Sequence, residues 1–246
     1  MKNYIVFGGA KSGIGEAISK KLLDSGAAVW SSSERDDVDL AKKIKNEYPK
    51  FNNFEIDHSS YDSLNDFIKN ITAKIDGIVI AQMYFDIRKV SDFSIEEWNR
   101  TLAVNISLPQ IVATKLSSKI KSGGAIVIIS STEGFVGSFG AGGYAASKAA
   151  VHNLVKTHAN ILGRDNVRIN AIAAGWIGGV MDTDEVFNRS RAITPLGRLG
   201  DPKEIAAVTY FLLGDDSSFM TGTTVVVDGG YSCVDAISKF EYESLK

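Results

Sequence analysis

The sequence has too little cysteine and histidine to build a disulfide framework or a metal centre. Its 246 residues include one cysteine, Cys233, so an internal disulfide and a cysteine-rich zinc site are both excluded. Cysteine usage this low is compatible with a reducing compartment. The three histidines, His58, His152 and His158, are too scattered to suggest a set of metal ligands. We therefore predict no metal site and a cytoplasmic location.

The chain also lacks long apolar runs and an excess of either charge. No run approaches the roughly 18–20 residues that a membrane-spanning helix needs, and the early stretch from Tyr4 to Phe7 is too short for a signal-peptide core. Acidic and basic residues number 29 and 27, and Lys42, Lys43 and Lys45 lie among carboxylates, as on a solvated helix face. We expect neither a membrane nor nucleic acid as a partner.

What the chain does have is a hydrophobic fraction of 44%, which excludes disorder as its main description. Short β-branched runs alternate with longer segments whose apolar residues recur at helical spacing. The runs expected as strands are 3–8, 27–32, 51–56, 76–81, 124–130, 167–173 and 223–228. The segments expected as helices are 14–25, 37–48, 60–73, 95–121, 144–163, 182–193 and 201–213. This alternation predicts an α/β fold with a doubly wound parallel sheet, in one domain over 1–246.

The first predicted strand runs directly into a glycine-rich turn. Glycine lets the backbone turn tightly and approach a pyrophosphate, while the N-terminus of the following helix offers free N–H groups. The spacing Gly9-x3-Gly13-x-Gly15 differs from the general dinucleotide fingerprint, and Lys11 does not fit a Walker A loop because Ala10 precedes it. A tight strand–helix connection without a ligand is the alternative. The turn's place after the first strand favours a dinucleotide.

Tyr144 and Lys148 lie four residues apart, on one face of a long predicted helix. The same spacing recurs at the extreme C-terminus, so the pair alone is not distinctive. Ser131, however, follows the C-terminal end of a predicted strand, where ligands bind in open α/β sheets. Asn105 is polar among apolar neighbours, which suggests a buried hydrogen-bonding role, with a satisfied core amide as the alternative.

Further motifs follow in order along the chain. They are Asp57, Val167-Arg168-Ile169-Asn170-Ala171-Ile172, Pro195-Leu196-Gly197-Arg198, Pro202-Lys203-Glu204-Ile205-Ala206, Thr221-Gly222 and Val227-Asp228-Gly229-Gly230. Together with the glycine-rich turn, Asn105, Ser131 and the Tyr–Lys pair, they resemble the short-chain dehydrogenase/reductase family over about residues 3–230. The resemblance implies a Rossmann-type sheet of order 3-2-1-4-5-6-7, nicotinamide binding and hydride transfer. It also implies a homotetramer (or dimer), formed through the helices at 95–121 and 144–163 and the last strand.

The predicted chemistry is the interconversion of a carbonyl and a secondary alcohol. Tyr144 would be the general acid or base, and the Lys148 ammonium would lower the ordinary Tyr pKa near 10. Ser131 would hydrogen-bond the substrate oxygen. By resemblance, Lys148 also holds the nicotinamide ribose and Asn105 anchors a chain of waters. A dinucleotide-binding sensor or scaffold without turnover is the alternative function, and a lyase or epimerase is a weaker one.

The resemblance places the dinucleotide along the glycine-rich turn and the strand ends. The residues expected to bind it are Gly9, Lys11, Ser12, Gly13, Ile14, Gly15, Ser33, Glu34, Arg35, Asp57, Ala81, Asn105, Tyr144, Lys148, Gly175 and Ile177. NAD-preferring relatives carry an acidic residue at the position aligned with Ser33. Because Ser33 lacks that charge, while Lys11 and Arg35 are cationic, we expect NADP(H); Glu34 favours the alternative, NAD(H).

The chain departs from the family pattern after the predicted fourth strand, where Ile80-Ala81-Gln82-Met83 replaces Asn-Asn-Ala-Gly. Met83 is therefore expected close to the nicotinamide. The small-molecule substrate is expected in a cleft lined by Met83, Tyr84, Phe135, Val136, Phe139, Trp176 and a lid at 178–194, with Asp182, Asp184, Arg189 and Arg191 as polar candidates. Residues 231–246 form a C-terminal extension beyond the family's usual end.

Overall fold

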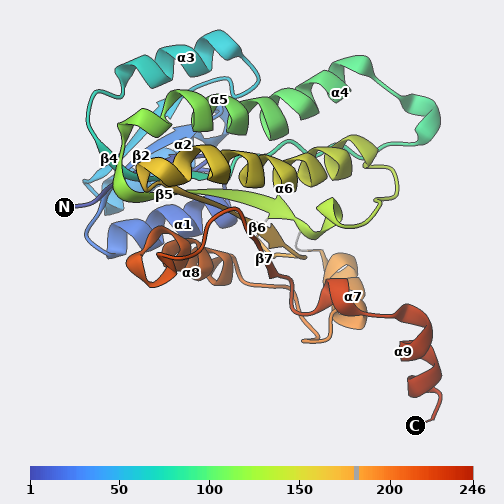
Figure 1. The fold of residues 1–246 in the computed structure, drawn as a ribbon. Helices are drawn as coiled ribbons and strands as arrows, with labels where there is room; N and C mark the ends of the chain where they lie inside the picture. Colours follow the sequence, from blue (N-terminus) through green and yellow to red (C-terminus); the bar gives the residue numbers. More distant parts are fainter. Residues whose placement is uncertain (180–182, 246) are drawn as a thin grey trace.

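A computed structural model describes residues 1–179 and 183–245, built around one seven-stranded parallel sheet (Figure 1). The strand order is β3-β2-β1-β4-β5-β6-β7, as the family resemblance implied. The strands are β1 (Asn3–Phe7), β2 (Ala28–Ser33), β3 (Phe51–Glu55), β4 (Ile75–Ile80), β5 (Ile120–Ser131), β6 (Arg168–Ala174) and β7 (Thr224–Val227). The predicted fold class is confirmed.

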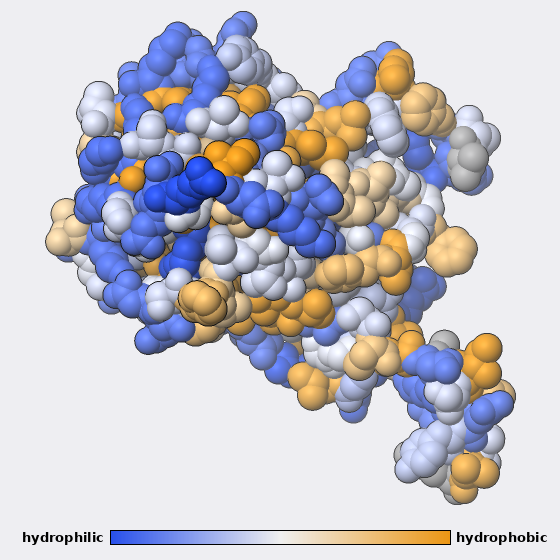
Figure 2. Space-filling view, viewed as in Figure 1, coloured by the Kyte–Doolittle hydropathy of each residue, from blue (hydrophilic) through white to orange (hydrophobic). Residues whose placement is uncertain are grey.

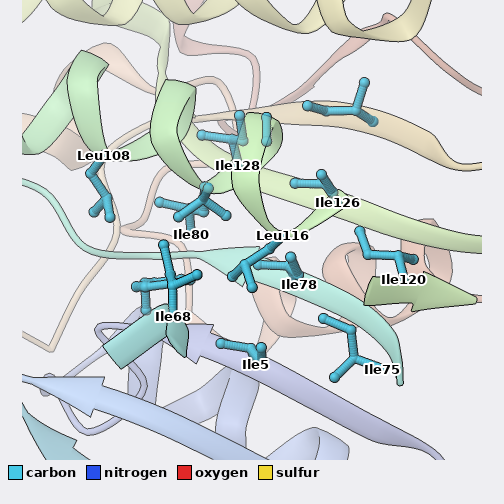
Figure 3. Packing of buried hydrophobic residues seen from close by; sticks show 14 of the residues in the cluster. Ile5, Ile68, Ile75, Ile78, Ile80, Leu108, Leu116, Ile120, Ile126 and Ile128 are labelled. Carbon is cyan, nitrogen blue, oxygen red and sulfur yellow. The ribbon is translucent and has the colours of Figure 1, made fainter. Parts of the chain in front are cut away.

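Helices cover both faces of the sheet because alternate residues of each strand point to opposite sides. Ile5 and Phe7 of β1 belong to one core cluster, and Tyr4 and Val6 to the other. The first cluster includes residues of α3 (Tyr61–Asn70), α5 (Leu108–Lys115) and α6 (Gly142–Leu162), and Figure 3 shows its isoleucines interleaving. The second includes residues of α1 (Ile14–Asp24), α2 (Val38–Glu47) and α8 (Pro202–Leu213).

The helix predicted over 95–121 is wrong in its continuity and its end. The structure has α4 (Ile95–Leu102), a π-helical turn at Ala103–Ser107 and then α5. Ile120 already belongs to β5, where it pairs with Ile75 of β4. Leu116 and Ile120 are both buried, four residues apart, so the helical apolar pattern continues in the sequence beyond the true end of the helix.

Two shorter helices lie outside these layers. The first is α7 (Asp184–Ile193), in the predicted lid, and Thr183 caps its N-terminus by accepting a hydrogen bond from the Val186 N–H. Asp182, proposed above as a polar substrate contact, lies outside the described residues. The second is α9 (Ala236–Glu243), which projects away from the sheet (Figure 1) and was not expected from the sequence. No helix in the described chain is long and apolar enough to cross a membrane.

Candidate active site

Three predicted catalytic residues meet where β5 ends beside the start of α6. Tyr144 lies in the first turn of α6, Lys148 lies one turn later, and Ser131 is the last residue of β5. The Lys148 Nζ is 5.4 Å from the centroid of the Tyr144 ring. The Tyr144 and Ser131 side chains are hydrogen-bonded to each other. This cluster lies at the carboxyl edge of the sheet, where open α/β folds bind ligands.

Burial sets the protonation of the two titratable groups in this cluster. It raises the pKa of Tyr144 to about 12, with the charge of Glu133 acting in the same direction and the hydrogen bond with Ser131 acting against it. Burial also lowers the pKa of Lys148 to about 8. The Lys148 Nζ donates to the Ile129 carbonyl at 3.0 Å, and no carboxylate pairs with it in the described chain. At neutral pH the tyrosine is therefore a phenol and the lysine is still largely an ammonium.

Asn105 is placed next to this cluster by the π-helical turn that carries it. Its side chain is 2% exposed, and its amide exchanges two 2.8 Å hydrogen bonds with the Tyr84 backbone N–H and C=O. The Nδ2 also donates to the Ser147 Oγ at 3.0 Å, and Ser147 in turn donates to the Tyr144 carbonyl at 2.6 Å. These are the contacts of a satisfied amide that ties the loop after β4 to α6.

The glycine-rich turn leaves the N-terminus of α1 open to a ligand. Gly13 caps the helix at φ 84° with no side-chain hydrogen bond, so the first N–H groups, beginning at Ile14, have no side-chain partner there. A Cβ at Gly15 would lie 1.9 Å from the Gly8 carbonyl oxygen, and one at Gly9 would lie 2.7 Å from the Ser19 Oγ. The bare backbone of this turn fits the pyrophosphate of a dinucleotide.

Lys11 and Ser12 reach from this turn toward other loops. The Lys11 Nζ donates to the Met83 carbonyl after β4 at 3.5 Å, and the Ser12 Oγ donates to the Gly179 carbonyl after β6 at 3.2 Å. The structure therefore brings the turn, the altered segment after β4 and the start of the predicted lid together along one edge of the sheet.

Ser33, at the end of β2, does not lie where the cofactor prediction needs it. Its side chain is 0% exposed, and its Oγ accepts a 2.7 Å hydrogen bond from the Asn53 Nδ2. The predicted direct contact between Ser33 and a 2′-phosphate is therefore not supported. Ser33 is the last residue of β2 and points into the structure, whereas the next residues, Glu34 and Arg35, reach the surface.

Glu34 is held by three neighbours. Its Oε1 lies 3.5 Å from the Nδ1 of the fully buried His58, its Oε2 lies 3.8 Å from Arg100 Nη2, and Gln82 Nε2 donates to its Oε1 at 3.2 Å. The interaction with His58 is the largest cause that lowers the pKa of Glu34, so the group is a carboxylate at neutral pH. Gln82 comes from the altered segment after β4, so that departure contributes directly to this cluster.

The other predicted cofactor residues lie just past the ends of three further strands. Asp57 follows β3, and its Oδ1 accepts hydrogen bonds from the backbone N–H and side chain of Ser59. Ala81 follows β4 and donates its N–H to the Phe7 carbonyl. Gly175 and Ile177 follow β6. Within the described residues, no group of three or more His, Cys, Asp or Glu side chains could hold a metal ion.

Sequence reasoning missed two side chains beside Tyr144. The Phe85 ring meets the Tyr144 ring edge to face, with centroids 5.0 Å apart. Glu133 comes two residues after Ser131, its Oε2 is buried, and that oxygen has no hydrogen-bond partner among the described residues. Its place just after a strand end was the signal that could have revealed Glu133. Nothing local in the sequence marks Phe85, because only the tertiary fold brings it to Tyr144.

Comparison with known proteins agrees with this architecture. A family model described as enoyl-(acyl carrier protein) reductase matches residues 8–232. The 3-oxoacyl-[acyl-carrier-protein] reductase FabG of Aquifex aeolicus (strain VF5) is 34% identical over 234 residues, which cover 90% of this chain and 94% of that protein.

Two solved structures share the fold. BdcA in complex with NADPH has a TM-score of 0.87 at 24% identity, covering 93% of each chain. The 4-hydroxyisoleucine dehydrogenase complexed with NADH also has a TM-score of 0.87, at 25% identity, covering 96% of this chain and all of that one. The sheet order, the position of the Ser131–Tyr144–Lys148 cluster and these matches agree. The chain belongs to the short-chain dehydrogenase/reductase family of NAD(P)-dependent oxidoreductases.

Proposed function

We propose that this oxidoreductase interconverts a small carbonyl compound and the corresponding secondary alcohol, with Tyr144 as the general acid or base. One observation carries the proposal: the half-buried phenol of Tyr144 interacts with Ser131, and its ring centroid is 5.4 Å from the Lys148 Nζ, at the same edge of the sheet as the glycine-rich turn. All three proton-transfer residues are together at the ligand edge, which favours an enzyme over a scaffold of the same fold.

Tyr144, Ser131 and Lys148 have different roles around the substrate oxygen. In reduction, the C=O π bond breaks as its carbon gains a hydride, and the oxygen takes the proton of the Tyr144 hydroxyl. Because burial raises the pKa of Tyr144 to about 12, the phenol keeps this proton at neutral pH until a charge develops on the substrate. Ser131 donates to the same oxygen, and the Lys148 ammonium stabilises the phenolate left behind. In oxidation the proton moves in the opposite direction.

The nicotinamide cofactor, when bound, supplies or accepts the hydride. The glycine-rich turn and the first turn of α1 would hold its pyrophosphate, because Gly13 at the N-cap brings no side chain to the first N–H groups of the helix. Lys148 and Tyr144 would hold the ribose next to the nicotinamide, as the family resemblance implies. Asn105 would keep the loop after β4 in register with α6, through its paired bonds to Tyr84.

For the cofactor preference, NADP(H) remains the favoured form in our proposal. The buried Ser33 does not support this preference directly, so the preference depends on Lys11 and Arg35. Neither side chain has a carboxylate ion-pair partner within residues 1–179 and 183–245. Glu34 opposes it, although Gln82, His58 and Arg100 already engage that carboxylate. A 2′-phosphate would gain charge-assisted hydrogen bonds from these two cations, Lys11 and Arg35.

Two further proposals concern the surroundings of the site. We propose that residues 178–194, including α7, cover the substrate, and that the chain forms a homotetramer or dimer. Supporting the latter, Ile95, Trp98 and Ile161 are exposed on α4 and α6, the helices expected at the interface. The cytoplasmic location expected from the sequence stays a prediction.

The deciding experiment follows NADPH and NADH oxidation with a panel of ketones and aldehydes, for the wild type and Tyr144→Phe. We expect turnover by the wild type and a loss of about 10²–10⁴-fold in kcat for the variant, because general acid catalysis is removed. Cofactor affinity, measured by nicotinamide fluorescence, should change little. Turnover retained within a few-fold by Tyr144→Phe would contradict the assignment.

A further inference from the structure

We propose that Glu133 is a specificity-determining residue, and that its carboxylate binds an ammonium or hydroxyl group on the carbon next to the reacting carbonyl of the substrate. The inference rests on the proposed function, since it concerns the substrate of the same site. Both groups, the ammonium and the hydroxyl, are hydrogen-bond donors, and the experiment below distinguishes between them.

The position of Glu133 in the chain fixes how near its partner must be. Ser131, which would hold the substrate oxygen, is two residues earlier, and the Ser131 Oγ accepts the Glu133 backbone N–H at 3.1 Å. Two residues span at most about 7 Å of backbone. The Glu133 side chain therefore starts close to Ser131, and a donor on the carbon next to the carbonyl carbon is within its reach.

The Glu133 side chain is poised for a donor that the described chain does not supply. Its Oε2 is withdrawn from solvent and has no hydrogen-bond partner among the described residues. None of the ion pairs within residues 1–179 and 183–245 includes Glu133, and the nearby Lys148 Nζ donates to the Ile129 carbonyl instead. Buried acceptors in folded proteins are normally paired, so an unpaired one beside a substrate cluster is a candidate ligand contact.

The charge of Glu133 gives a second, independent reason. Its carboxylate raises the pKa of Tyr144, and so disfavours the phenolate that the reaction forms. A carboxylate at this place therefore opposes catalysis unless another group compensates its charge. An ammonium on the substrate would neutralise it, and a hydroxyl would reduce it by donating a hydrogen bond.

The backbone of the loop around Glu133 is fixed on both sides. On one side, the Thr132 Oγ1 donates to the Ala174 carbonyl at 3.5 Å. On the other, Gly134 lies directly on the His152 ring, since a Cβ there would be 2.4 Å from the ring carbon Cε1. His152 is itself hydrogen-bonded to the Ser130 Oγ at 2.9 Å. Such support holds a binding group in place before the substrate arrives.

The test compares three ketones of the same skeleton: 3-aminobutan-2-one, 3-hydroxybutan-2-one and butan-2-one. For the wild type we expect kcat/KM for at least one of the first two to exceed that for butan-2-one by tenfold or more. In Glu133→Gln this ratio should fall at least tenfold, mainly through KM, and more for the amine because the variant loses the charge. Glu133→Asp should restore part of the ratio.

A matched control is Glu47→Gln, which removes an exposed carboxylate on α2 and should leave the ratio unchanged. Circular dichroism and the cofactor dissociation constant verify that each variant is folded. The affinities of 3-aminobutan-2-ol, butane-2,3-diol and butan-2-ol for the protein with oxidised cofactor give a second readout that needs no turnover. In Glu133→Gln, we expect the preference in affinity for the amino alcohol or the diol over butan-2-ol to fall tenfold as well.

The two proposals fail in different ways. If none of the carbonyl compounds is turned over although cofactor binds, the proposed function is wrong, and the alcohol affinities alone decide the role of Glu133. If the wild type shows no preference for an adjacent donor, or Glu133→Gln keeps it, the role of Glu133 is wrong and the oxidoreductase assignment stands. A preference lost for the amine alone identifies an ammonium as the partner, and equal losses identify a hydrogen bond.

Discussion

Lys148 combines a functional position with an unfavourable environment. Its side chain is 3% exposed, and burial lowers its pKa to about 8. Its Nζ donates to a carbonyl, and no carboxylate pairs with it among the described residues. A lowering of this size corresponds to about 3 kcal/mol of unfavourable charge burial at neutral pH. The unliganded protein therefore carries the buried ammonium of Lys148 at a cost in stability, and its proposed role begins only when substrate and cofactor bind.

We expect Lys148→Met to stabilise the unliganded protein by about 1–3 kcal/mol at pH 7, while abolishing turnover. Below pH 8 the wild-type lysine is charged in both states, so the full cost is present. Between pH 8 and the ordinary Lys pKa of 10.5, the folded protein has lost the proton that the unfolded chain keeps, so wild-type stability rises with pH. Urea unfolding at pH 7 and 9.5 measures both effects, and a less stable variant at pH 7 would contradict them.

Arg35 should decide the cofactor preference, now that Ser33 is known to be buried. We expect Arg35→Ala to weaken NADPH binding about tenfold, because one charge-assisted hydrogen bond contributes roughly 1.5–3 kcal/mol. NADH binding should change less than threefold. Fluorescence titration with both cofactors measures this, with Arg164→Ala as a control on an exposed residue of the α6–β6 connection. Equal or tighter NADH binding by the wild type would refute the NADP(H) preference.

At the scale of elements, the β1–α1 connection depends on the missing Cβ at Gly15. A methyl group there would meet the Gly8 carbonyl oxygen at 1.9 Å, and that atom belongs to the backbone. We expect Gly15→Ala to cost about 1–3 kcal/mol of unfolding free energy, as overpacking does. It should also weaken cofactor binding at least tenfold, because the displaced turn is the proposed pyrophosphate site.

Gly163 provides the matched control for that substitution. It ends α6 at φ −59° and ψ −30°, and a Cβ there meets nothing within 4 Å. Gly163→Ala should therefore stabilise the protein by about 0.4–1 kcal/mol through the unfolded state, with cofactor affinity unchanged. Urea unfolding and cofactor titration cover both variants. If Gly15→Ala matched Gly163→Ala in both measurements, the turn would not have the proposed role.

At the scale of the whole molecule, apolar side chains are exposed to solvent on α4, α6 and α9. Ile161 on α6 is 58% exposed, and Ile237 and Phe240 on the projecting α9 are 73% and 75% exposed. The space-filling view shows apolar groups on that projecting segment (Figure 2). Surfaces of this kind are typical of protein–protein contacts.

We expect light scattering to give a particle mass near four times the 26.5 kDa of one chain, or twice that mass for the dimer. Ile161→Arg should shift the distribution toward smaller species, because it places a charge in the expected contact of α6. Asn46→Arg, at an exposed position of α2 outside the expected interface, is the control. A wild-type particle of 26.5 kDa at micromolar concentration would contradict the assembly.

The sequence by itself determined the order of the elements, and the family resemblance added the expected sheet order and the Ser131–Tyr144–Lys148 constellation. Strands and helices have local periodicities of two and 3.6 residues, and these survive in any tertiary context. The limit of this reasoning is seen at 95–121. There, the buried Leu116 and Ile120 continue one helical pattern beyond the end of α5 at Lys115, although Ile120 pairs with Ile75 in the sheet.

Only the tertiary structure decided which side chains face which. Ser33 and Glu34 are neighbours in sequence, yet Ser33 ends β2 and is buried against Asn53, whereas Glu34 follows the strand and contacts His58, Arg100 and Gln82. Glu133 acquired its significance in the same way, because burial at the edge of the sheet removed water from its Oε2. Such side-chain contacts depend on the distances between elements that are far apart in sequence, and local periodicity carries no information about these distances.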